Sequence, residues 1–282
     1  MDGAGPSEFE LLQAANLRFG YTSALVVDDV SIDVGRRALV GVLGPNGSGK
    51  TTLLRLLAGT LRPQSGRVTL DGADLTRIPR AAVARRLAVV PQETQLAFEY
   101  TALEIALMGR YAHLRAFEVE GPADLASANA ALDATGTREL GARPFNTLSG
   151  GEKQRVVIAS ALAQLDQGEG PTAKGQGPGR LLFLDEPTAS LDLHYQVEMA
   201  NVIRRLHDEQ DISIVLSTHD LHFAAAVCED VILLRRGRVL ARGATADVLT
   251  PAALAELYDL QPEVVAAWSS GVTSPVRDRE GR

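Results

Sequence analysis

The sequence predicts an α/β fold, with a mostly parallel β-sheet, an antiparallel β flank and a helical subdomain. Three observations lead to this prediction. Short runs rich in apolar and β-branched residues alternate with helical patterns along the chain. The early runs are joined by short turns, whereas the later runs are separated by helices, which is typical of a parallel sheet. One long helical stretch interrupts this alternation in the middle of the chain.

The predicted strands are apolar runs bounded by polar or turn-forming residues. They cover residues 38–43, 67–70, 87–90, 181–185 and 212–217. Residues 9–34 contain further strands joined by short turns, and Asp71-Gly72 is a turn signal directly after the run 67–70. The early strands are therefore expected to form the antiparallel flank, and the later strands the parallel core.

The helical subdomain is predicted over about residues 93–150. Its helical pattern runs from Thr101 to Thr135 and begins with the letters TALE, which fit a capping box. The alanine-rich run DLASANAALDA follows within the same stretch. A strong start signal and good helix formers together favour helices here.

Residues 8–260 are predicted to form a single domain. Within it, residues 166–180 hold five glycines and two prolines, which predicts a flexible surface loop. Loops of this length are either functional or tolerated insertions, and both readings stay open. Residues 261–282 are expected to form a loosely held C-terminal tail.

The composition is that of an ordinary globular protein, with 282 residues of which 45% are hydrophobic and 22% charged. A formal net charge of −7 argues against a broad nucleic-acid-binding surface, so no nucleic acid partner is expected.

The single cysteine, Cys228, cannot form an internal disulfide and is expected to be a small buried residue in a reducing compartment. No export signal and no apolar run near the roughly 20 residues of a membrane helix are recognised. Any role at a membrane is therefore expected to need a partner.

The first chemical motif is GPNGSGKT at residues 44–51, between an apolar strand and a helical pattern. Its glycines let the backbone wrap closely around an anion, and the N–H groups of the helix start point at phosphate. Lys50 can reach the phosphate oxygens, and Thr51 offers a hydroxyl to Mg²⁺. The motif predicts a P-loop NTPase core that binds a nucleoside triphosphate. The predicted binding residues are Gly44, Pro45, Asn46, Gly47, Ser48, Gly49, Lys50, Thr51 and Thr52.

The second motif is LLFLDEP at residues 181–187, in which a buried strand ends in two carboxylates. Ligands of open α/β sheets bind at this end of the strands. Asp185 is predicted to hold the water shell of Mg²⁺, and Glu186 to accept a proton from the attacking water. A solvated surface turn is the plainer alternative, which the buried strand and the phosphate loop disfavour.

The third motif is LSGGEKQR at residues 148–155, directly before the helical run VVIASALAQL. Ser149 is a predicted N-cap, and Gly150 and Gly151 leave the backbone bare. These features predict a second anion-binding helix start. A purely structural cap is the alternative, although a cap alone does not need two glycines.

Together the phosphate loop, LSGGEKQR, LLFLDEP and the later STHD resemble the ATP-binding subunits of ABC transporters, from residue 21 to about residue 250. LSGGEKQR is the specific feature, because the first two patterns occur throughout P-loop proteins. The resemblance implies that Tyr21, rather than Phe19, stacks on adenine. It also implies that Gln92 reaches Mg²⁺ and the attacking water, and that His219 contacts the γ-phosphate.

The roles implied by the resemblance fall into three groups. The implied catalytic residues are Glu186, Gln92 and His219, and the implied metal ligands are Thr51, Gln92 and Asp185. The residues implied to act across a dimer interface are Ser149, Gly150, Gly151, Glu152 and Asp192. The remaining histidines carry no such role: His113 lies in the helical subdomain, and solvated side chains are expected for His194, His207 and His222.

The resemblance also implies partners. In this family the Ser-Gly-Gly helix of one copy covers the γ-phosphate held by the other, so the chain is expected to form a head-to-tail dimer with two ATPs. It is further expected to serve polytopic permease subunits at the cytoplasmic face of the membrane, and indirectly an extracytoplasmic substrate-binding protein.

Within the family, RLAVVPQE, FEYTALEIALMGRYAHL and TASLDLHYQVEM resemble the ATPases of importers for ferric siderophores, haem or cobalamin. One departure is Thr218, where these importers often have Leu. The alternatives are an ATP-switched protein of the superfamily that does not transport, an ABC subunit for another substrate, and a P-loop small-molecule kinase. The missing internal repeat, the absence of sustained heptads and the presence of LSGGEKQR disfavour the non-transport readings.

Overall fold

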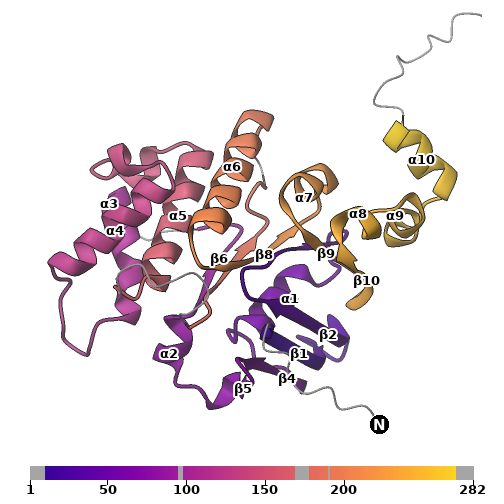
Figure 1. Ribbon diagram of the computed structural model, residues 1–282, viewed down its shortest axis with the longest axis horizontal. Helices are drawn as coiled ribbons and strands as arrows, with labels where there is room; N and C mark the ends of the chain where they lie inside the picture. The colour runs from indigo at the N-terminus through magenta and orange to yellow at the C-terminus, as the bar shows by residue number, and fades with distance from the viewer. Residues whose placement is uncertain (1–9, 95–97, 169–177, 190, 271–282) are drawn as a thin grey trace, which may run out of the picture.

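The computed structural model describes residues 10–94, 98–168, 178–189 and 191–270, which form two β-sheets and a set of helices (Figure 1). The larger sheet has six strands in the order β10-β9-β3-β8-β7-β6, and the smaller has four in the order β2-β1-β4-β5. In the described part of the chain, no helix combines the length and the apolar composition that crossing a bilayer would need.

The six-stranded sheet is the parallel core expected from the sequence. Its five parallel strands are short, apolar and almost entirely buried, as strands covered on both faces must be. Only the edge strand β10 runs antiparallel, paired with β9. The strands are β3 (Leu39–Leu43), β6 (Leu87–Val90), β7 (Leu181–Asp185), β8 (Ser213–Thr218), β9 (Asp230–Arg235) and β10 (Arg238–Ala244).

The smaller sheet is the expected antiparallel flank. It consists of β1 (Glu10–Phe19), β2 (Val27–Gly35), β4 (Ser65–Leu70) and β5 (Ala73–Asp74), all paired antiparallel. Helix α1 (Lys50–Leu57) lies between the two sheets, and its buried leucines share one hydrophobic cluster with both of them. The phosphate loop before α1 is therefore supported from two sides.

The predicted helical subdomain consists of helices packed on one another, seen to the left in Figure 1. The capping box at Thr101 is present: its hydroxyl accepts from the Glu104 N–H at 3.3 Å, and its own N–H donates to the Glu104 carboxylate at 2.7 Å. The helices are α3 (Ala102–Met108), α4 (Pro122–Ala134) and α5 (Gly150–Leu165), with 3-10 turns at Gly109–Ala112, Arg138–Leu140 and Phe145–Thr147.

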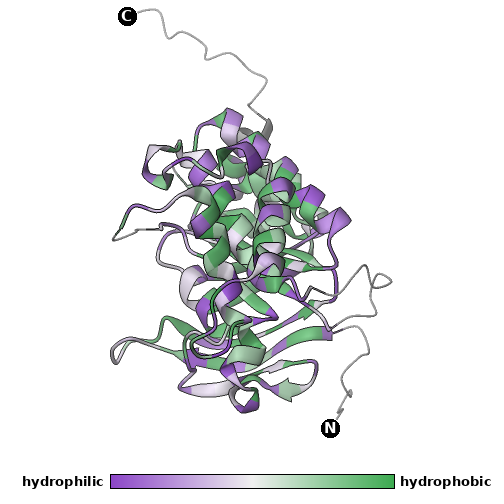
Figure 2. Ribbon diagram, turned by 90° about the vertical axis from the view of Figure 1, so that its left-hand side faces the viewer, coloured by the Kyte–Doolittle hydropathy of each residue, from purple (hydrophilic) through white to green (hydrophobic). Residues whose placement is uncertain are grey.

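The remaining helices are α2 (Arg80–Ala84), α6 (Leu193–Glu209), α7 (Leu221–Val227), α8 (Thr245–Val248), α9 (Pro251–Tyr258) and α10 (Pro262–Ser270), with a 3-10 turn at Leu75–Arg77. Of these helices, α10 packs on α9 and lies away from the larger sheet (Figure 1). The stretch expected to be a tail begins with α10, because Pro262 followed by good helix formers can start a helix. Residues 169–177 of the expected loop and 271–282 of the expected tail lie outside the described residues. Figure 2 shows the hydrophobic residues gathered along the sheets and on the helix faces turned toward them.

Two single side chains test the expected pattern of burial. Cys228 is buried against Gly41, as expected, and burial raises the pKa of its thiol to about 12. The expectation for His207 was wrong: only 8% of it is exposed, and its Nε2 donates to the carbonyl of Arg37 at 2.8 Å. This contact joins α6 to a turn 170 positions earlier in the chain, which no local pattern could indicate.

Candidate functional site

The phosphate loop follows β3 and needs its glycines for two different reasons. Gly47 and Gly49 have φ angles of +78° and +104°, which side chains disfavour. A Cβ at Gly44 would lie 2.2 Å from the carbonyl oxygen of Leu234, so this residue must approach the neighbouring backbone closely. Inside the loop the buried Ser48 hydroxyl has no hydrogen-bond partner among the described residues. Such a loop with unused polar groups suits a ligand that accepts or shares hydrogen bonds.

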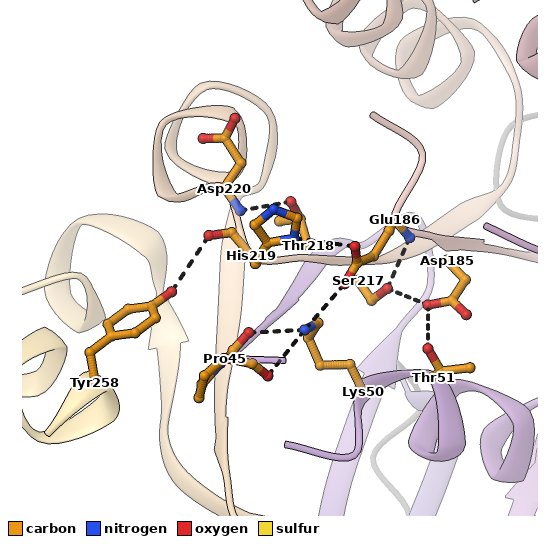
Figure 3. A network of polar contacts seen from close by, with 11 residues as sticks. Pro45, Lys50, Thr51, Asp185, Glu186, Ser217, Thr218, His219, Asp220 and Tyr258 are labelled. Carbon is orange, nitrogen blue, oxygen red and sulfur yellow. Dashed lines mark hydrogen bonds and ion pairs between the residues drawn. The ribbon is translucent and has the colours of Figure 1, made fainter. Parts of the chain in front are cut away.

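Lys50 begins α1 and points into the centre of the site (Figure 3). Its ammonium group donates to the carbonyls of Gly44 at 2.9 Å and Pro45 at 3.4 Å. It also lies 3.3 Å from the carboxylate of Glu186, and only 5% of its side chain is exposed. A buried cation held among oxygens in this way is ready to meet a phosphate.

The two adjacent carboxylates have different surroundings. Asp185 is buried and accepts hydrogen bonds from Thr51 Oγ1 at 3.0 Å and from Ser217 Oγ at 2.6 Å. Glu186 lies one residue beyond β7 with a φ of +47°, a left-handed conformation that costs about 1–3 kcal/mol. Its N–H donates to Ser217 Oγ at 3.0 Å, which holds this conformation and directs the carboxylate into the site.

His219 completes the centre of the site. It lies between β8 and α7, and its Nδ1 is 3.2 Å from the Glu186 carboxylate. Asp220 caps α7 by accepting from the N–H groups of His222 and Phe223, which fixes the backbone just after the histidine. The Lys50 ammonium, the Glu186 carboxylate and the His219 imidazole thus form a continuous polar chain (Figure 3).

These groups open into a pocket of about 650 Å³. Tyr21 lies near it: the tyrosine hydroxyl is 3.5 Å from Thr52 Oγ1, and its exposed ring meets the edge of Phe19. Phe19 is partly buried and packs against a hydrophobic cluster instead, and Tyr21 itself is not among the residues that line the pocket. The predicted residues that line the pocket are Asn46, Gly47, Gly49, Lys50, Thr51, Thr52, Gln92, Glu186 and His219.

The LSGGEKQR residues do not join this pocket within one chain. Ser149 caps α5. Its N–H donates a hydrogen bond to the Glu152 carboxylate, and this bond is the main reason why the pKa of that carboxyl is lowered. A Cβ at Gly151 would lie 2.6 Å from the Tyr195 ring, so α5 begins directly against α6. Asp192 caps α6 by accepting from the Tyr195 N–H at 3.2 Å. Ser149, Gly150, Gly151, Glu152 and Asp192 therefore gather at two adjoining helix starts that lie outside the pocket.

Sequence reasoning missed one residue that supports the site, Ser217, and several residues that line its pocket. Ser217 holds both Asp185 and Glu186, and its place in the same run as His219 was an available signal. Gln196 lies on α6, where nothing in the local pattern indicates a site. The other missed lining residues are Val26, Thr188, Ala189 and Asp220.

The donor set of the pocket fits Mg²⁺. The side-chain oxygens of Thr51 and Asp185 lie 3.0 Å apart at the base of the phosphate loop. The Gln92 side chain adds an amide oxygen to the same pocket. Mg²⁺ prefers oxygen ligands and commonly takes one or two protein groups together with phosphate and water.

The fold and the pocket define a P-loop protein that binds nucleoside triphosphates. Residues 27–167 match the family described as ABC transporter. The chain belongs to this family, and the predicted fold class and family are confirmed.

Curated relatives resemble the chain over most of its length. It is 43% identical to the hemin import ATP-binding protein HmuV of Myxococcus xanthus, covering 90% of each protein. It is 39% identical to the hemin import ATP-binding protein HmuV of Bordetella pertussis, covering 90% of this chain and 94% of that protein. It is also 38% identical to the cobalamin import ATP-binding protein BtuD of Halobacterium salinarum, of which it spans 61% of the length.

Solved structures share the fold. A transporter described as of the metal-chelate type, in an inward-facing conformation, superposes with a TM-score of 0.74 at 31% identity, covering 89% of both chains. A dimeric bacterial ABC transporter cassette superposes with a TM-score of 0.68 at 23% identity, covering 83% of this chain and 99% of that one. The second likeness concerns the fold alone.

Proposed function

We propose that this chain is the ATP-hydrolysing subunit of an importer for a metal chelate of the haem, cobalamin or ferric-siderophore class. The observation that carries the proposal is the convergence of Lys50, Glu186 and His219 beside the phosphate loop in one pocket. The relatives named for hemin and cobalamin import support the substrate class.

The pocket supports ATP binding in a definite orientation. The phosphates would lie against the N–H groups of the loop and the start of α1, with Lys50 at the β- and γ-oxygens. Tyr21, near Thr52, would stack on the adenine. When phosphate forms an ion pair with the Lys50 ammonium, Glu186 would lose that partner. Its carboxylate would then be able to accept a proton.

Hydrolysis then needs a base and a group that holds the γ-phosphate. Glu186 would accept the proton of the attacking water. His219 lies 3.2 Å from that carboxylate and would contact both the γ-phosphate and Glu186, which would keep the two groups close together. Gln92, which also lines the pocket, would orient the water. Mg²⁺, held by Thr51, Asp185 and Gln92, would neutralise the charge that develops on the phosphate oxygens.

A second copy would complete the site. Ser149, Gly150, Gly151, Glu152 and Asp192 lie at two helix starts outside the chain's own pocket, so they would serve the ATP of a partner. Two such contacts generate a two-fold, head-to-tail dimer with ATP in both interfaces. Hydrolysis breaks the bond between the β- and γ-phosphates, the freed phosphate leaves, and without the contact that it made to both copies the dimer would open.

Opening and closing would be transmitted to polytopic permease subunits at the cytoplasmic face of the membrane. The helical subdomain carries FEYTALEIALMGRYAHL, the stretch that most resembles the chelate importers. An extracytoplasmic binding protein would deliver the chelate to the permease.

The hydrolytic role is tested by phosphate release from the purified full chain with Mg²⁺ and ATP. Glu186→Gln keeps the shape of the side chain but removes the base, so turnover should fall by roughly 10²- to 10⁴-fold. ATP affinity should stay within twofold of the unsubstituted protein. Equal turnover in the two proteins would remove Glu186 from the reaction.

The transport role is tested in liposomes that contain the chain together with a polytopic permease subunit that copurifies with it. Haemin, cyanocobalamin and a ferric siderophore are each offered with a purified binding protein, and ATP-dependent uptake is measured. Uptake of one of the three, lost in Glu186→Gln, is expected. If the rate of ATP hydrolysis is the same with and without the permease, and no uptake occurs, the result would instead favour a switch protein that does not transport.

A further inference from the structure

Helix α9 lies outside every sequence motif, yet its last residues reach the site. The hydroxyl of Tyr258 lies 3.5 Å from the backbone carbonyl oxygen of His219 and donates to it (Figure 3). Tyr258 is half-buried and packs against the large hydrophobic cluster around the parallel sheet. Its ring therefore has little freedom to move away from the histidine.

The position of Tyr258 is fixed by the residue that follows it. Asp259 ends α9 in a left-handed conformation, with a φ of +58°. Its carboxylate forms ion pairs with Arg235 and Arg236, at the end of β9. The end of α9 is thus bound to the turn between β9 and β10, while Tyr258 reaches across to the end of β8.

The same β9–β10 turn supports the phosphate loop. The N–H of Gly237 donates to the carbonyl of Ser48 at 3.0 Å. The carbonyl of Leu234 lies so close to Gly44 that no side chain fits there. One structural unit, consisting of the end of α9 and the β9–β10 turn, therefore contacts both the loop that would hold the phosphates and the histidine that faces them.

The chemistry of Tyr258 suits a constant donor. Burial, and to a lesser degree the charge of Asp220, raise the pKa of its hydroxyl, so the proton stays in place at neutral pH. The carbonyl that receives it belongs to the residue between the end of β8 and the cap of α7.

We infer that Tyr258 is a positioning residue for His219: its hydroxyl holds the backbone carbonyl of the histidine so that the imidazole keeps its place beside Glu186. The inference rests on the proposed function for its effect on turnover, although the contact itself does not. Tyr258 acts through His219 and does not touch the nucleotide.

The first test compares ATP hydrolysis by the full chain with Tyr258→Phe, which removes only the hydroxyl. Loss of one hydrogen bond should lower kcat by about 2- to 10-fold and leave the KM for ATP unchanged. Tyr111→Phe is the matched control, because Tyr111 is an exposed tyrosine of the helical subdomain whose hydroxyl contacts Glu120. It should change neither constant.

A double-mutant comparison separates positioning from a general loss of structure. In a His219→Gln background the hydroxyl has no imidazole to place, so adding Tyr258→Phe should lower kcat no further. An equal fall in both backgrounds would overturn the inference.

Hydrogen exchange gives a readout that does not require activity. Without nucleotide, Tyr258→Phe should speed amide exchange in residues 218–222, and Tyr111→Phe should leave it unchanged. Unaltered exchange in Tyr258→Phe would refute the inference. If the unsubstituted protein failed to hydrolyse ATP, the proposed function would fall while the exchange result would still decide the role of Tyr258.

Discussion

Glu186 shows how one backbone conformation separates the roles of two neighbouring carboxylates. Asp185 ends β7 and accepts hydrogen bonds from two hydroxyls at its Oδ1, whereas Glu186 turns away in a left-handed conformation toward Lys50 and His219. Strained residues of this kind persist where the surroundings hold them, as Ser217 does here. The strain supports a chemical role for Glu186 rather than a solvated turn.

Tyr21 offers a prediction about a single side chain. Because its exposed ring lies near the phosphate loop, Tyr21→Ala should weaken ATP binding by roughly 1–3 kcal/mol, the value of one base stacked on an aromatic ring. Tyr21→Phe keeps the ring and should bind nearly as well. Calorimetric titration with ATP in the Glu186→Gln background measures both. Equal affinity of the alanine variant and its parent would exclude stacking.

Many residue-scale features could be predicted because their causes are local. Ser149 and Thr101 cap helices through bonds that span three positions, and the sequence pattern of a capping box contains both partners. The burial of His207 and the contact from Tyr258 to His219 could not be predicted, since their partners lie 170 and 39 positions away.

Arg110 is the main link between elements of the helical subdomain. It is buried just after α3, and its guanidinium donates to Asp124 on α4 at 2.9 Å and to the carbonyls of Ala163 and Asp166 at 2.7 and 2.6 Å. Two hydrogen bonds lower the pKa of the Asp124 carboxyl below its ordinary value. The larger effect comes from the Gly121 N–H and the smaller from Arg110. This contribution to stability is present at neutral pH and is lost as the pH falls through the folded-state pKa.

Removing that link should destabilise the subdomain. Arg110→Met leaves a largely buried carboxylate and two carbonyls without their donor, so the free energy of unfolding should fall by roughly 3–5 kcal/mol. Arg138→Met is the matched control, because Arg138 pairs with Asp133 on the surface, where such pairs contribute about 0–1 kcal/mol. Urea unfolding followed by circular dichroism measures both. Similar losses in the two variants would contradict the special role of Arg110.

At the level of elements, the alternation of strands and helices was sufficient to predict the parallel core and its antiparallel flank. Hydrophobic runs such as 181–185 and 212–217 read as buried strands from composition alone. The helix Pro262–Ser270 was missed, because a short stretch after a domain boundary carries little periodic signal. The boundaries proposed for the domain and its subdomain stay predictions.

The separation of the two helix starts that we expect to bind anions leads to a prediction about the whole molecule. With ATP, the Glu186→Gln protein should be a dimer by light scattering, and Ser149→Arg should keep it monomeric by filling the interface. Nucleotide affinity should persist, since Ser149 lies outside the chain's own pocket. Thr101→Arg makes the same change at the other capping box and should leave dimerisation intact. An ATP-dependent dimer that survives Ser149→Arg would show that the two copies meet elsewhere.

The order of strands could not be predicted. Strand β3, which leads into the phosphate loop, lies between β8 and β9, although both follow it by more than 160 residues. Hydrophobic pattern identifies a strand but does not name its neighbours. The meeting of Lys50 with Glu186 and His219 depends on this order.

This strand order has a consequence for synthesis on the ribosome. Until residues 213–235 have been made, β3 has neither of its neighbours, and the backbone groups along both of its sides lack their partners. The larger sheet therefore stays incomplete around β3 until β8 and β9 have been made, and unpaired strand edges of this kind favour aggregation. Stalled nascent chains should retain ATP only when the stall falls far enough beyond residue 235 to release β9 from the exit tunnel.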